Sequence, residues 1–234
     1  MAKSGHIERA HIVVSLWPDS VNNNNSACDD FQIKKIRTLE QKKASYVGEY
    51  SALFLLNNSS SKAKESNKKE IVDDIKEILI HTSPKVVYTH SLFDKHETHI
   101  ATAIKVIQAL RSIPSAHRPQ KIYGCEVWGS LDWLADEYKI VFDLQNHENL
   151  LSSLISLYDS QINGGKEYDN AIIGRRKSNA IFHNTQEIIE ATSAAFAMDL
   201  SILIQDEHID IKEYAIKYIQ NFESNVSENL MKLY

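Results

Sequence analysis

The predicted fold follows from one stretch of the sequence, residues 86–111. It begins with the strand-like run Val86-Val87-Tyr88-Thr89, continues with the polar segment HSLFDKHETH at 90–99 and ends at Arg111. A short apolar run rich in β-branched residues predicts a buried strand. The residues after the polar segment repeat their apolar positions at helical spacing, which predicts a helix over about 98–111. The stretch therefore has the pattern of one strand–loop–helix unit.

The same alternation recurs along the chain in both directions. Strands are predicted at 10–17, 52–56, 122–128 and 138–144. Helices are predicted at 29–47, 70–82, about 147–161, 185–198 and 210–231, with a loop at 57–69 and a turn at Asn163-Gly164-Gly165. Strands that alternate with helices indicate a three-layer α/β/α, Rossmann-like domain with a mostly parallel sheet. We expect this domain to span 1–205 and a helical extension to follow at 206–234.

Composition excludes several classes of protein. The chain has 234 residues, 43% of them hydrophobic, which argues against disorder, and it has no apolar run long enough to span a membrane. Its net charge of −5 argues against a nucleic-acid partner. No secretory signal or disulfide framework is evident, so a cytoplasmic location is expected. Seven glycines, without dinucleotide-binding or Walker spacing, disfavour those nucleotide-binding folds.

The polar segment carries the candidate chemistry. His90, Asp94, His96, Glu97 and His99 fall within ten residues, where a strand of an open sheet is expected to end. Neutral imidazole is a good zinc ligand, and a neighbouring carboxylate can orient its second ring nitrogen. His96 and His99 are three residues apart and can face the same side of a helix start. Two interpretations stay open, metal binding and simple capping and solvation of a loop.

The order of several motifs resembles the PIG-L/LmbE-like N-deacetylases, in particular a bacterial branch of that family. Those enzymes are zinc hydrolases that remove acetyl groups from N-acetylglucosamine-type amines. The resembling segments are Tyr88-Thr89-His90 with 94–99, Arg37-Thr38-Leu39-Glu40, 123–128, 131–133, 159–162, 164–166, Gly174-Arg175-Arg176 and 197–200.

The resemblance implies roles for particular residues. His99 matches a zinc ligand, and His96 matches the histidine that polarises the substrate carbonyl or protonates the leaving amine. Arg37 matches a position that faces the sugar or braces the active-site loop, with Glu40 as its partner. The implied reaction is zinc-assisted hydrolysis of a small N-acetylated substrate.

The family's other metal motif, His-x-Asp-Asp, does not occur in this sequence. The nearest string is Trp17-Pro18-Asp19-Ser20, in which Asp19 keeps the position of the general base. Tryptophan cannot ligate zinc and serine is a poor ligand. An alternative alignment makes 10–17 the second strand of the family, so that the first strand and its motif are absent. Exposed sheet edges would then favour self-association into a homo-oligomer.

Three explanations of this departure remain open. The chain is a shortened reading frame of an active enzyme, a family member that has lost catalysis and binds a sugar conjugate or a partner, or an enzyme in which Asp19 or another acid completes an unusual site. A metal-free hydrolase using His96 and Asp94 is a more distant alternative.

Three further residues are candidates for substrate binding. Glu126 lies at a predicted strand end and faces either the substrate cleft or solvent. Arg175 and Arg176 follow the glycine turn and can hold a phosphate or carboxylate of the substrate, or form a paired surface face.

Overall fold

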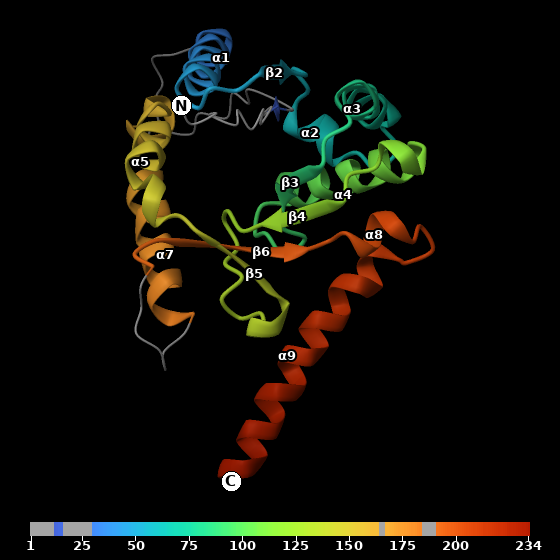
Figure 1. The fold of residues 1–234 in the computed structure, drawn as a ribbon, viewed down its shortest axis with the longest axis vertical. Coiled ribbons are helices and arrows are strands. Elements are labelled where there is room, and N and C mark those ends of the chain that lie inside the picture. The colour runs from blue at the N-terminus through green and yellow to red at the C-terminus, as the bar shows by residue number, and fades with distance from the viewer. Residues whose placement is uncertain (1–11, 16–29, 164–166, 184–190) are drawn as a thin grey trace, which may run out of the picture. The chain divides into compact units, whose positions relative to one another are not determined.

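The computed structural model describes residues 12–15, 30–163, 167–183 and 191–234, which divide into two compact units (Figure 1). Unit 1 comprises residues 1–59 and 147–173, and unit 2 comprises 60–146 and 174–234, each as far as it is described. Asp19 and the glycines of the predicted 163–165 turn lie outside the described residues.

Unit 1 is built around one parallel pair of strands. β1 (Ile12–Ser15) pairs with β2 (Ala52–Leu55), with Ile12 opposite Ala52 and Ser15 opposite Leu55. The other elements of the unit are α1 (Asp30–Val47), η3 (Gln145–His147) at its boundary, α5 (Glu148–Ser156), α6 (Asp159–Gln161) and the start of α7 (Tyr168–Phe182). The chain leaves α1 through Gly48, whose amide donates to the carbonyl of Ala44 at 2.8 Å.

Unit 2 contains a four-stranded sheet in the order β3-β4-β6-β5. Its strands are β3 (Val86–His90), β4 (Lys121–Cys125), β5 (Lys139–Asp143) and β6 (Ala194–Asp199). Its helices are α2 (Ser60–Lys64), α3 (Lys69–Thr82), α4 (Glu97–Ser112), η1 (Ser115–His117), η2 (Asp136–Tyr138), α8 (Ile202–Gln205), α9 (Ile211–Leu233) and most of α7.

The sheet of unit 2 is mixed. β3 and β4 run parallel, whereas β6 runs antiparallel to both β4 and β5. In Figure 1, α4 lies beside β3, and α3 packs against α4 and buries Ile71, Ile75 and Leu79. The expected α/β class is confirmed, and the antiparallel β6 is the feature that the alternating pattern did not predict.

Two local predictions were wrong, and one helix was missed. The helix predicted at 185–198 is the strand β6 over its described second half, because this segment is buried between β4 and β5. Helix α7 was not predicted, since its central GRRKSN stretch shows no regular apolar spacing. The tract 57–69 is not only loop, because α2 forms within it around the fully buried Ala63.

No helix of the described chain is long and apolar enough to cross a membrane.

Candidate functional site

The polar segment between β3 and α4 forms a tight turn held by its own side chains. The Ser91 amide donates to the carbonyl of Cys125 at 2.9 Å, which keeps the turn against the end of β4. The Ser91 hydroxyl accepts from the amide of Phe93 at 3.1 Å. Asp94 accepts from the amide of His96 at 2.8 Å, immediately before α4 begins. Short serine and aspartate side chains favour this kind of turn.

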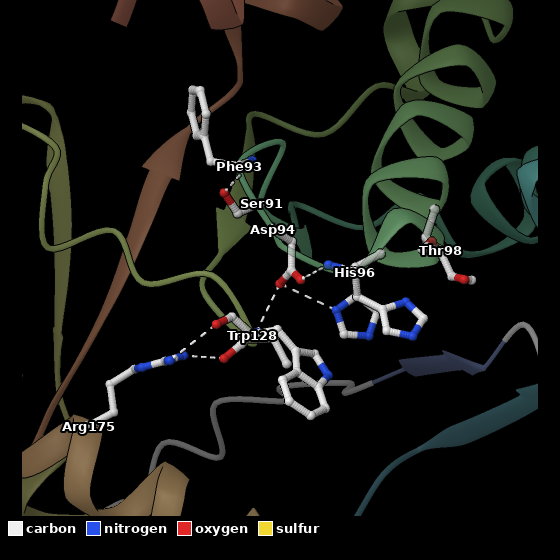
Figure 2. Close-up of polar contacts among 10 residues, drawn as sticks. Ser91, Phe93, Asp94, His96, Thr98, Trp128 and Arg175 are labelled. Carbon is white, nitrogen blue, oxygen red and sulfur yellow. Dashed lines mark hydrogen bonds and ion pairs between the residues drawn. The ribbon is translucent and has the colours of Figure 1, made fainter. Parts of the chain in front are cut away.

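Asp94 is the centre of the site, and its side chain is fully buried. Oδ1 accepts from the His96 amide, while Oδ2 accepts from the Trp128 amide at 3.0 Å and lies 3.3 Å from Nδ1 of His99 (Figure 2). Burial raises the pKa of Asp94, but the two amides and the adjacent His99 outweigh it, so the pKa lies below its ordinary value. The carboxylate is therefore ionised at neutral pH.

Three imidazole rings lie together at this turn. The rings of His90 and His99 are stacked with centroids 4.0 Å apart and planes 3° apart, and that of His96 lies 4.8 Å from His99. Burial lowers the pKa of His90 to about 4. Burial also lowers the pKa of His99, although Asp94 opposes the shift. His90 and His99 are therefore neutral at pH 7, the form in which imidazole binds a metal.

The contact with Asp94 orients His99 in a way that suits a metal ligand. With Nδ1 of His99 facing the carboxylate, Nε2 on the opposite side of the ring is left as the donor atom. A catalytic zinc site needs about three protein ligands, however. Within the described residues no group of three His, Cys, Asp or Glu side chains is placed to hold a metal ion. The described residues therefore do not by themselves make a complete zinc site.

The carboxylate of Glu126 is hydrogen-bonded within the protein. Oε1 accepts from the Asn179 side chain at 2.5 Å and from the Phe196 amide at 3.1 Å, and Oε2 accepts from the Leu131 amide at 3.1 Å. These bonds join the end of β4 to α7, to β6 and to the loop that follows β4. Both oxygens are engaged in holding these segments together.

The two arginines predicted to bind substrate have different surroundings. Arg175 donates through both terminal nitrogens to backbone carbonyls, those of Val127 and Trp128 (Figure 2). Arg176 is half-buried; burial lowers its pKa, and the nearby Glu126 carboxylate opposes that shift.

Arg37 and Glu40 belong to α1 in unit 1, whereas the histidines belong to unit 2. Glu40 is buried and accepts from the amide and the hydroxyl of Ser160, both at 2.7 Å. Its carboxylate thus links α1 to α6. Arg37 is half-buried on the same helix.

Sequence reasoning missed the contribution of the loop after β4. The Trp128 amide contacts Asp94 from 34 residues away, and a backbone donor leaves no trace in residue identity. Gly129, one of only seven glycines in the chain, was the one sequence feature that could have indicated a close backbone approach in this loop. A Cβ at Gly129 would lie 2.5 Å from the carbonyl oxygen of Phe93 and 3.0 Å from the Cα of Asp94.

Comparison with known proteins gives a family match over part of the chain and a shared fold. The PIG-L family model, described as GlcNAc-PI de-N-acetylase, matches residues 7–110. No curated protein sequence matches the chain. Among solved structures, N,N'-diacetylchitobiose deacetylase from Pyrococcus horikoshii, complexed with its inhibitor MPG, is similar with a TM-score of 0.63 and 13% identity, over 84% of this chain and 75% of that one.

Two further solved structures share the fold. GalB, the 4-carboxy-2-hydroxymuconate hydratase from Pseudomonas putida KT2440, has a TM-score of 0.60 and 12% identity over 82% of this chain and 84% of its own. The A40926 pseudoaglycone deacetylase Dbv21 has a TM-score of 0.53 and 13% identity over 82% and 85%, respectively. One of these proteins is a hydratase, so the fold alone does not decide the reaction. Residues 7–110 of the chain therefore match the PIG-L family model, and the chain shares its fold with these two deacetylases and with the hydratase.

Proposed function

We propose that the protein is an N-deacetylase-type amide hydrolase that acts on an N-acetylated amino sugar or a related small amide. The family match over residues 7–110 and the deacetylases among its structural neighbours support this reaction class. The observation that carries the proposal is the Asp94–His99 pair. A buried carboxylate 3.3 Å from Nδ1 fixes a neutral imidazole whose Nε2 is left to bind a metal.

We assign His99 as a metal ligand and His96 as the neighbouring group that contacts the substrate amide. His96 is exposed, and its ring centroid is 4.8 Å from that of His99. A side chain in that position can donate to or accept from a group bound beside His99. Asp94 is then a positioning residue, because its contacts are to the protein.

Zinc dependence is part of the proposal. Zinc supplies a Lewis acid for an amide carbonyl when it is bound by a complete ligand set. Because the described residues hold no group of three donors, at least part of the ligand set must come from outside them. The predicted role of Asp19 as general base, the cytoplasmic location and self-association stay predictions.

A second candidate function is binding without catalysis. The observation that favours it is the absence of a three-ligand group within the described part of the chain. Such a protein would still recognise an N-acetylated sugar conjugate or a partner, but would not hydrolyse it.

Acetate release separates the two candidates. The substrates are N-acetylglucosamine and N,N'-diacetylchitobiose, assayed with the chelated and the zinc-supplemented protein. A hydrolase releases acetate only with zinc, and His99→Ala abolishes the release. The matched control His208→Ala replaces an exposed histidine far along the chain and keeps the parent rate. Sugar binding without acetate release in any preparation would support the second candidate and overturn the first.

A further inference from the structure

Arg175 holds the loop that follows β4 by its backbone. The side chain comes from α7, and its two terminal guanidinium nitrogens donate to the carbonyls of Val127 and Trp128, the latter at 3.2 Å (Figure 2). A planar guanidinium fork suits two neighbouring acceptors, because both hydrogen bonds fix its orientation. Two consecutive peptide groups are therefore held by one side chain.

The same loop fixes Asp94 from its other side. The Trp128 amide donates to Oδ2 at 3.0 Å, and Oδ2 is also the oxygen that faces Nδ1 of His99. Gly129 brings the loop so close that a Cβ there would lie 3.0 Å from the Cα of Asp94. The Trp128 amide and the His96 amide, one on each oxygen, thus together fix where the Asp94 carboxylate lies.

We infer that Arg175 is a positioning residue for His99 and acts through the Trp128 peptide and Asp94. The sequence of contacts runs from the guanidinium to the Trp128 carbonyl, from the Trp128 amide to Oδ2, and from Oδ2 to Nδ1 of His99. The hydrogen bonds of Arg175 in this arrangement go to the backbone carbonyls of Val127 and Trp128. Its assignment as a positioning residue for a metal ligand rests on the proposed function, whereas the control of the His99 ring by Arg175 does not.

The inference differs from the substrate-binding role that the sequence predicted for Arg175. A guanidinium that binds a substrate anion changes the KM when it is removed. A guanidinium that positions a histidine through a peptide changes the state of that ring in the protein without substrate. The two roles therefore give different results in one set of variants.

The test is nuclear magnetic resonance of the metal-free, substrate-free chain labelled with 15N in tryptophan and histidine. The variants are Arg175→Ala, Arg175→Lys and the control Lys177→Ala, an exposed residue on the same helix. The backbone amide of Trp128 is assigned from Trp128→Phe, and the ring of His99 from His99→Gln. Long-range 1H–15N correlations identify which His99 nitrogen carries the proton.

The parent and Lys177→Ala should show His99 as the Nδ1–H tautomer, with the Trp128 amide proton shifted downfield by its carboxylate acceptor. Arg175→Ala should move that amide upfield, speed its hydrogen exchange about tenfold and give a mixture of His99 tautomers. Guanidinium ion should partly restore the parent spectrum. Arg175→Lys, which offers one donor group instead of a fork, should give an intermediate spectrum and serves as the test if Arg175→Ala does not fold.

Unchanged Trp128 and His99 signals in folded Arg175→Ala or Arg175→Lys would overturn the inference, whatever the protein's activity. If the chain is an active hydrolase, Arg175→Ala should also weaken zinc binding by about 10-fold or more and leave KM within about 2-fold. A raised KM with unchanged spectra would instead support the substrate-binding role. Unchanged Trp128 and His99 signals in the Arg175 variants would thus refute the positioning role, whereas absence of hydrolysis in the parent would refute the proposed function. The two failures are distinguishable.

Discussion

Oδ2 of Asp94 lies 3.3 Å from Nδ1 of His99, and the carboxylate is fully buried. A buried carboxylate that also accepts two backbone amides cannot move to follow the ring, so the ring is held in place by the turn. In the sequence pattern Asp-x-His-x-x-His, the aspartate therefore orients the ring of the last histidine, His99.

Asp94→Asn should weaken zinc binding by about 10- to 100-fold, because an amide holds the His99 ring less firmly and can present a donor to it. The measurement is calorimetric titration of the chelated protein with zinc. The control is Asp132→Asn, which changes an exposed acid in the loop after β4. Equal zinc affinity in the parent and in Asp94→Asn would show that Asp94 does not position His99 for metal binding.

Gly129→Ala should destabilise the fold by about 1–3 kcal/mol, since the added Cβ would meet the backbone of Phe93 and Asp94. Urea unfolding measures the change. Gly174→Ala is the matched control, because no atom lies within 4 Å of its Cβ and it sits inside α7. That substitution should stabilise the protein by about 0.5–1 kcal/mol. A Gly129→Ala protein as stable as the parent would show that the two loops are not packed as described.

Glu126→Ala should lower the free energy of unfolding by about 3 kcal/mol, because it leaves three internal donors without their acceptor. Glu137→Ala, at an exposed acid, should change stability by less than about 0.5 kcal/mol. If Glu126→Ala kept the parent stability and only raised KM, the carboxylate would be a substrate contact as the sequence suggested.

The stability of the chelated protein should fall as the pH drops below about 6.5, the ordinary pKa of histidine. Burial lowers the pKa of His90 to about 4 in the folded state, so between these two pH values the unfolded chain binds a proton that the folded chain excludes. The loss reaches at most about 3 kcal/mol near pH 4. Urea unfolding against pH should show a shallower slope for His90→Gln than for the parent and for His208→Gln. The same slope in all three proteins would contradict the buried, neutral state of His90.

The sequence predicted the elements of unit 2 that precede and follow the histidines, because each had a strong and regular pattern. α3 was expected at 70–82 and spans Lys69–Thr82; it ends at Ser83, whose left-handed backbone breaks the helix. Ala194–Asp199 was mistaken for helix because alanine and methionine favour helices, yet pairing with two strands overrides that preference.

The candidate site was predictable only in part, for a physical reason. His90, Asp94, His96 and His99 are neighbours in sequence, so their spacing revealed them. The partners of Glu126 lie up to 70 residues away, and two of the three are backbone amides. Residue type carries no information on such contacts, which depend on how β4, β6 and α7 pack.

The assignment of His99 as a zinc ligand is best tested by the zinc content of the purified 234-residue chain. It is measured by mass spectrometry of the metal after zinc loading and desalting, in the parent, His99→Ala and His208→Ala. We expect about one zinc per chain in the parent and in His208→Ala, and almost none in His99→Ala. No zinc in the parent, or the same zinc content in His99→Ala, would contradict the assignment of His99 as a metal ligand.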